Sequence, residues 1–213
     1  MVGVIAMDTH ISRQQDIYGG RRRDLEALAA ELTAAVNGFR RELSARYGDD
    51  PIEHLEYRIK SEKSMREKLE RKGLAQTTEN ALYAMHDAVG IRVVCSFIRD
   101  VYEVRDFLVS LSDMEIVDEK DYIRHVKPNG YRSYHLILRC HRDLCAEIQI
   151  RTISMDTWAA LEHHMKYKKN LDENTALIVS ELKRCADELA STDLSMQTIR
   201  DMILESAETE EDK

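Results

Sequence analysis

KPNGYRSYH at residues 127–135, followed by EIQIRT at residues 147–152, is the part of the sequence that says most about the fold. The first segment combines a cation, a glycine turn, two tyrosines, an arginine and a histidine, as a loop that binds a purine nucleotide requires. The second segment alternates acidic, amide and basic side chains with isoleucines, so it predicts a β-strand with one polar face and one core face. Together they indicate nucleotide chemistry on a β-sheet.

Hydrophobic patterns on either side of these segments predict a chain of mixed α and β structure. We expect strands at residues 90–97, 115–122, 133–138 and 145–150, and an extended segment around 58–60. We expect helices at residues 25–46, 61–72, 78–86 and 101–111, and helical structure from 154 to about 205 with a break near 170–174. The fold class is therefore α/β (α+β), a mixed β-sheet flanked by helices, with long N- and C-terminal helices.

Composition narrows the class of protein. The chain has 213 residues, of which 43% are apolar, so it can bury the core of a single domain. Its net charge of −8 disfavours non-specific binding to nucleic acid, so an anion site requires a local concentration of cations. The four cysteines lack metal-binding spacing and are expected to be free thiols in a reducing cytosol. The sequence has no signal peptide and no membrane-spanning run, so we expect a cytoplasmic protein.

The first candidate site is basic and lies at the start of the predicted helix 61–72. It comprises Arg58, Lys60, Ser64, Lys68 and Arg71. Arg58 and Lys60 are two residues apart in an extended segment and so face the same way. Lys60, Ser64 and Lys68 follow at a spacing of four if the helix begins near Lys60, which favours a cradle for polyphosphate at a helix N-terminus. The alternative is a solvated basic helix face balanced by neighbouring glutamates.

The second candidate site is a pair of carboxylates, Asp87 and Glu147, beside or within apolar strands. A carboxylate in a buried strand is costly unless it is paired or binds a cation. Mg²⁺ is held in proteins by one or two carboxylates together with phosphate oxygens, so the pair suits this ion. The alternative is a structural ion pair of either carboxylate with Arg92 or Arg151.

Polar residues near these carboxylates extend the site. Glu147, Gln149 and Arg151 alternate along one strand, which predicts a solvated strand face. The ring of Tyr131 can stack on a base or pack at the rim of the core, and His135 can contact phosphate or lie on the surface. Trp158 is expected to anchor the core.

Four segments in order resemble a known family. They are RIKSEKS (58–64), HDAVGIRV (86–93), DYIRHVKPNGYRSYH (121–135) and EIQIRTISMDTWAALEH (147–163). This set closely resembles the synthetase domain of RelA/SpoT homologues, the (p)ppGpp alarmone synthetases, over about residues 25–170. No segment resembles the hydrolase or regulatory domains of the long members. The chain therefore resembles a small, RelQ/RelP-like synthetase.

The resemblance implies an activity and an organisation. The reaction transfers pyrophosphate from ATP to the 3′-hydroxyl of GDP or GTP, or of GMP, and releases AMP in the stringent response. A nucleotidyltransferase-like sheet, Mg²⁺, a homotetramer formed through terminal helices and allosteric (p)ppGpp belong to the same expectation. Residues 1–22 would be an irregular leader, 23–170 the synthetase domain, 171–204 a helical oligomerisation extension and 205–213 an acidic tail.

The resemblance also implies residue roles. Those expected around ATP are Arg58, Lys60, Ser64, Lys68, Arg71 and Arg92, with Arg58 and Arg92 on either side of the adenine. Those expected at the acceptor nucleotide are Lys127, Tyr131, His135, Gln149, Arg151 and Asp156, with Tyr131 stacked on guanine. The catalytic, metal-binding carboxylates would be Asp87 and Glu147. Asp156 departs from the asparagine of relatives, but a carboxylate can also accept from guanine N1–H and N2–H₂.

Two other functions stay open at this point. A relative that pyrophosphorylates the 3′ end of tRNA would require a basic surface, which the net charge of −8 argues against. A nucleotide- or RNA-binding regulator without activity would not require the carboxylates Asp87 and Glu147. RNA binding is otherwise not indicated.

Overall fold

The computed structural model describes residues 16–140, 142–166 and 175–211, and its centre is a five-stranded sheet in the order β1-β2-β5-β4-β3. The strands are β1 (Ile52–Ile59), β2 (Val89–Cys95), β3 (Met114–Asp121), β4 (Tyr134–Cys140) and β5 (Cys145–Thr152). β2 and β5 are parallel, whereas the other neighbouring strands are antiparallel. The mixed sheet and four of its strands are as predicted.

The fifth strand, β1, was predicted only as an extended segment around residues 58–60. Its sequence IEHLEYRI is mostly exposed, so it lacks the apolar run that identifies an inner strand. Charged side chains on an edge strand also protect the sheet against pairing with other chains. The register places Arg58 opposite Gly90 and Glu56 opposite Arg92, so the edge strand contributes charges to one sheet face.

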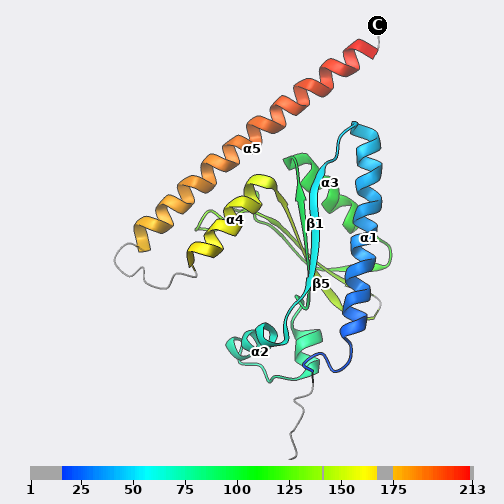
Figure 1. Ribbon diagram of the computed structural model, residues 1–213, viewed down its shortest axis with the longest axis vertical. Helices are drawn as coiled ribbons and strands as arrows, with labels where there is room; N and C mark the ends of the chain where they lie inside the picture. The colour runs from blue at the N-terminus through cyan, green and yellow to red at the C-terminus, as the bar shows by residue number, and fades with distance from the viewer. Residues whose placement is uncertain (1–15, 141, 167–174, 212–213) are drawn as a thin grey trace, which may run out of the picture.

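One face of the sheet is covered by α1 (Arg22–Tyr47) and α3 (Ile98–Val109). Leu25, Leu28 and Leu32 recur at helical spacing on α1 and are at most 1% exposed. Gly48 ends α1 in the left-handed conformation, with φ of 73°. In Figure 1, α1 runs along one side of the sheet and α4 and α5 lie on the other side. The apolar core therefore lies between the sheet and the helices α1 and α3.

The end of the sheet near β1's last residue is closed by α2 (Glu62–Arg71) and by the π-helical turn η1 (Asn80–Ala84). Residues 16–21, expected to be part of an irregular leader, are irregular but packed. Tyr18 is 0% exposed, and its hydroxyl donates to the carbonyl oxygen of Lys60 at 2.7 Å. Residues 1–15 of the expected leader lie outside the described residues.

At the other end, β5 leads into α4 (Ile153–Lys166), and the long helix α5 (Thr175–Glu211) packs against α4 and α3. Trp158 is 5% exposed, which confirms its predicted place in the core. The expected break near residues 170–174 lies outside the described residues. The helix continues to Glu211, so the prediction that helical structure ends near residue 205 was wrong. The acidic sequence after residue 205 was expected to be a frayed tail, but glutamate and alanine favour helix, so the helix continues into it.

Cys95, Cys140 and Cys145 are buried free thiols and Cys185 is an exposed one, as expected. Among the described helices, none is long and apolar enough to span a membrane.

Candidate active site

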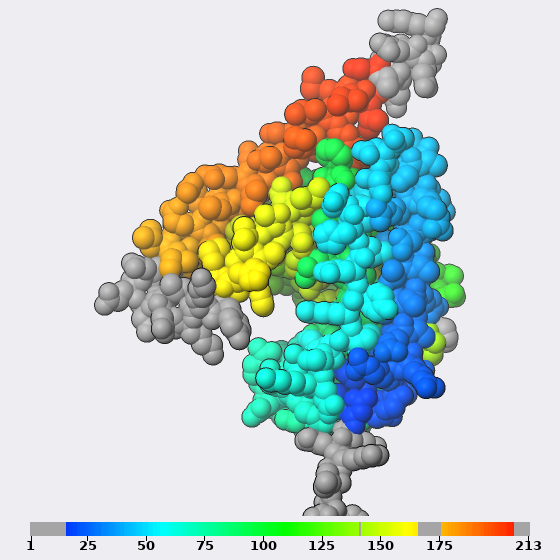
Figure 2. Space-filling model, viewed as in Figure 1, coloured from blue at the N-terminus to red at the C-terminus, as the bar shows by residue number. Residues whose placement is uncertain are grey.

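The polar face of the sheet is the one opposite α1 and α3. Val93 and Ile150, which are neighbours on β2 and β5, are 0% exposed on the core side. Their neighbours Arg92 and Gln149 point the other way, because side chains alternate along a strand. Figure 2 shows this side of the molecule hollowed between the yellow atoms of α4 and the teal atoms of α2.

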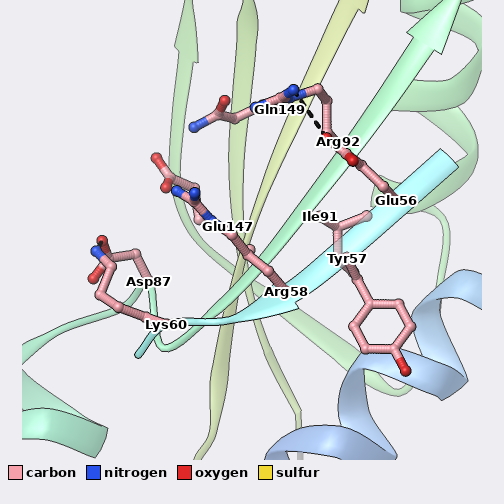
Figure 3. A pocket seen from close by; sticks show the side chains of 10 residues that line it. Glu56, Tyr57, Arg58, Lys60, Asp87, Ile91, Arg92, Glu147 and Gln149 are labelled. Atoms are coloured by element: carbon pink, nitrogen blue, oxygen red, sulfur yellow. Dashed lines mark hydrogen bonds and ion pairs between the residues drawn. The ribbon is translucent and has the colours of Figure 1, made fainter. Parts of the chain in front are cut away.

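A pocket of about 200 Å³ lies on this face. It is lined by Glu56, Tyr57, Arg58, Lys60, Asp87, Gly90, Ile91, Arg92, Glu147 and Gln149 (Figure 3). Six of the residues predicted from the sequence therefore share one pocket, although they come from β1, β2, β5, the segment after β1 and the segment before β2.

One part of the pocket is flanked by two arginines. Arg58 on β1 is exposed, whereas Arg92 on β2 is half-buried and its Nη1 lies 2.9 Å from Glu56 Oε1. Gly90 is the cross-strand partner of Arg58 and lies two residues before Arg92 on β2, and it adds no side chain of its own to the floor of the pocket. Two planar cations above a bare floor provide a place for a flat heterocycle.

A second part of the pocket brings lysines onto Asp87. Lys60 pairs with Asp87 Oδ2, and Lys68 Nζ reaches the same oxygen at 2.7 Å. Burial raises the pKa of Asp87, but hydrogen bonds from both lysines outweigh it and hold the pKa below its usual value. Lys60 precedes α2 instead of lying within it, so the predicted single helical row was wrong in that detail.

The remaining predicted phosphate residues lie on α2. Ser61 caps the helix, and its hydroxyl accepts from the backbone N–H of Ser64 at 3.2 Å. Ser64 is exposed in the first turn and Arg71 in the last turn, and neither they nor Lys68 line the pocket; Lys68 is joined to it by its ion pair with Asp87. The structure therefore brings Lys60 and Lys68 together, but leaves Arg71 apart from them.

Glu147 lies in the centre of the pocket, on β5. His135 Nδ1 lies 3.2 Å from Glu147 Oε1. This hydrogen bond lowers the pKa of Glu147, and burial and the nearby charge of Asp87 oppose the shift without reversing it. The predicted alternative, ion pairs of Asp87 or Glu147 with Arg92 or Arg151, is not what forms: the partners are lysines and a histidine.

The carboxylate pair fits a divalent cation. Asp87 Oδ1 is buried and has no hydrogen-bond partner among the described residues, so a hard oxygen ligand is available in the pocket. No group of three or more His, Cys, Asp or Glu side chains in the described part of the chain is placed to hold a metal. A cation bound here would therefore need further oxygens from water or phosphate.

The carboxylate pair is connected to a polar network at the α4 end. The hydroxyl of Tyr131 lies 2.8 Å from His135 Nε2 and accepts from Arg151 Nη2 at 2.7 Å. Arg151 also pairs with Asp156 Oδ1 at 3.0 Å, and Arg92 Nε lies 3.5 Å from the same oxygen. All the predicted acceptor residues on β4, β5 and α4 therefore belong to one network with Gln149, whose Oε1 accepts from Arg151 at 2.7 Å.

Aromatic rings and a cation complete this end. Lys127 Nζ lies 4.1 Å from the ring centroid of Tyr122 and 4.8 Å from that of Tyr131. Tyr131 also packs edge-on against Trp158, with centroids 6.4 Å apart. The ring of Tyr131 is thus half-buried and held by its neighbours.

Four residues of this face were missed in the sequence. Glu56 would have followed from recognising β1, because it shares a strand face with Arg58. Gly90 could have been found from the sequence, since an isolated glycine in a strand often marks a close approach of a ligand or backbone. No sequence pattern indicates Tyr122 or Ser133, because only the tertiary structure places them here. The hydroxyl of Ser133 accepts from Arg151 Nε at 3.3 Å.

Comparison with known proteins identifies the family of this chain. The family model described as "Region found in RelA / SpoT proteins" matches residues 57–172. GTP pyrophosphokinase YwaC of Bacillus subtilis is 47% identical over 148 residues, which cover 66% of this chain and 70% of that protein. GTP pyrophosphokinase YjbM of the same organism is 34% identical over 187 residues, which cover 83% of this chain and 85% of that protein.

Solved structures give the same result. The small alarmone synthetase 1 of Bacillus subtilis bound to its product pppGpp has a TM-score of 0.72 and 30% identity, with 85% of this chain and 95% of that chain covered. A GTP pyrophosphokinase family protein from Streptococcus pneumoniae has a TM-score of 0.73 and 35% identity, with 85% and 92% covered. The chain therefore belongs to the RelA/SpoT family.

Proposed function

We propose that this protein is a GTP pyrophosphokinase that transfers pyrophosphate from ATP to the 3′-hydroxyl of GDP or GTP and releases AMP. The observation that carries the proposal is the position of Asp87 and Glu147. They line one pocket with the arginine pair, and Glu147 is hydrogen-bonded into the tyrosine–arginine network. Two nucleotides could therefore meet at the carboxylates, each held on its own side.

The donor side is proposed to bind ATP. The adenine would lie between Arg58 and Arg92 above Gly90, and the phosphates would extend toward Lys60 and Lys68. Phosphoryl-type transfer depends mainly on positioning and on neutralising charge, and this side supplies both. Ser64 and Arg71 on α2 are proposed to act at the outer phosphate end.

The acceptor side is proposed to bind the guanine nucleotide. Tyr131 and Lys127 offer a ring and a cation, while His135, Gln149 and Arg151 offer polar groups beside Glu147. Asp156 could accept from guanine N1–H and N2–H₂. Because Asp156 already pairs with Arg151, the base would share this carboxylate with the arginine.

Asp87 and Glu147 are proposed to hold Mg²⁺. When bound, the ion would neutralise phosphate charge and help to align the reacting groups. The lowered pKa of Glu147 makes it a weak base at neutral pH, so its main role here is to bind the metal and to orient the acceptor hydroxyl. His135, at 3.2 Å, holds the Glu147 carboxylate in place.

The protein is also proposed to form a homotetramer through its terminal helices. Large apolar side chains are exposed on α5: Leu177, Val179, Leu194, Met196, Ile199, Met202 and Ile203. Such a surface favours association. Sedimentation of a monomer at micromolar concentration would contradict this part of the proposal. Binding of (p)ppGpp at a regulatory site stays a prediction from the resemblance.

The function is tested by incubating the purified protein with ATP labelled on its γ-phosphate and with GDP, GTP, GMP or tRNA. We expect label on a guanine nucleotide and release of AMP, with Mg²⁺ required. Label on tRNA would favour the tRNA-modifying alternative. Absence of transfer to any acceptor would favour a regulator without activity.

A further inference from the structure

The inner side of α5 contacts the loop formed by residues 127–132, here called the acceptor loop. Gly130 in this loop has φ of +91° and is buried against α5. A Cβ at Gly130 would lie 2.7 Å from Ala186 Cβ and 3.1 Å from Lys183 Cα. The backbone of the acceptor loop therefore rests directly on the helix, and only glycine fits this contact.

Polar contacts of Arg132, two residues after Gly130, fix the same junction. Arg132 donates to the carbonyl oxygen of Gly130 at 3.0 Å and to Asp187 Oδ1 at 2.8 Å. The Arg132 side chain is 14% exposed, so this ion pair is partly shielded from water. Lys183 Nζ lies 2.8 Å from the other oxygen of Asp187. One carboxylate of α5 thus holds the arginine that in turn holds the loop backbone.

A third contact connects α5 to the ring of the acceptor loop. Trp158 on α4 donates from Nε1 to the carbonyl oxygen of Leu182 on α5 at 2.8 Å, and its ring packs against Tyr131. The position of Tyr131 therefore depends on α5 through the loop backbone and through Trp158.

We propose that α5 positions the acceptor loop, so that Asp187 and Ala186 set the affinity for the acceptor nucleotide without contacting it. This inference rests on the proposed function, in which Lys127 and Tyr131 bind the acceptor. Of the donor residues, Arg58 belongs to β1, Lys60 to the segment between β1 and α2, and Asp87 to the segment before β2, whereas α5 packs against α3 and α4. A change in α5 should therefore affect the two substrates unequally.

The test uses Asp187→Asn in the full-length protein, with Glu188→Gln as the matched control. Glu188 is the next residue on the helix, is 63% exposed and pairs with Arg184 on α5 itself. Binding of labelled GDP and of a non-hydrolysable ATP analogue is measured separately by equilibrium dialysis. We expect Asp187→Asn to raise the Kd for GDP by up to about fivefold, with the Kd for the ATP analogue unchanged and the melting temperature lowered by no more than about 4 °C.

A second variant, Ala186→Val, adds methyl groups against Gly130 and should raise the Kd for GDP by about tenfold. Trp158 is the only tryptophan in the chain, so its fluorescence reports on this junction directly. We expect a red-shifted emission in both variants, because a loosened junction admits water, and no shift in Glu188→Gln.

The inference is overturned if Asp187→Asn and Ala186→Val bind GDP as the control does, or if both substrates weaken equally. Wild-type protein that binds no guanine nucleotide would instead refute the proposed function, and the inference with it.

Discussion

Gly90→Val should weaken ATP binding while leaving the fold intact. Gly90 faces the pocket between Arg58 and Arg92, and a Cβ there would meet Arg58 Cγ and Nε at 3.7 Å, an ordinary contact distance. The folded protein can therefore accept a Cβ at this position, and valine in a strand removes the entropic cost of glycine, about 0.5–1 kcal/mol. The melting temperature should stay the same or rise.

The effect on ATP follows from the space that valine takes. Its methyl groups would extend from the floor into the place proposed for the adenine. Stacking of one base contributes about 1–3 kcal/mol, so its loss should raise the KM for ATP about fivefold to 150-fold. The KM for GDP should stay the same, because the acceptor network lies toward α4.

Steady-state kinetics with each substrate varied in turn provide the assay. Ile148→Val is the control, since Ile148 is buried on the opposite face of the neighbouring strand and should lose only about 0.5–1.5 kcal/mol of stability. A KM for ATP within twofold of wild type for Gly90→Val would refute the assignment of this pocket to the donor base.

Three further predictions concern positioning and stability. Tyr18→Phe removes the hydrogen bond to the Lys60 carbonyl oxygen, which contributes about 1 kcal/mol. The KM for ATP should rise about fivefold and the KM for GDP should stay the same. A KM for ATP equal to that of wild type would exclude this positioning role of Tyr18. Arg200→Met leaves the fully buried Asp100 without its ion-pair partner. The free energy of unfolding, measured in urea, should fall by about 3–5 kcal/mol. A fall of less than about 1 kcal/mol would contradict this prediction. Burial raises the pKa of Asp100 despite the opposing effect of Arg200. The stability of wild type relative to Asp100→Asn should therefore be greatest below about pH 4 and should fall as pH rises through the pKa of the folded state. Urea unfolding measured at a series of pH values would show the opposite slope if the pKa were lowered.

Much of the fold followed from local patterns. The alternation in EIQIRT correctly predicted that Ile148 and Ile150 face the core and that Glu147 and Gln149 face a polar side. The helical spacing of Leu25, Leu28 and Leu32 correctly placed α1, because its apolar stripe is long and regular. The edge strand β1 escaped notice, since an exposed edge carries charges instead of an apolar pattern.

The site was less accessible from sequence because it depends on tertiary contacts. Arg151 was expected on a solvated face but is only 5% exposed, since Ser133, Tyr131 and Asp156 surround its guanidinium. Tyr18 was assigned to a leader, although its hydroxyl supports the Lys60 backbone. No local pattern predicts either arrangement.

The pocket around Glu147 is proposed to transfer pyrophosphate from ATP to a guanine nucleotide. Measurement of AMP and of labelled guanine product from ATP and GDP, for wild type, Glu147→Gln and Glu115→Gln, tests this transfer. Glu115 is a control on β3, outside the pocket, with its side chain 66% exposed. We expect equal amounts of AMP and product from wild type and from Glu115→Gln. For Glu147→Gln we expect a loss of at least about 100-fold at an unchanged melting temperature. Near-normal turnover by a folded Glu147→Gln variant would contradict the account.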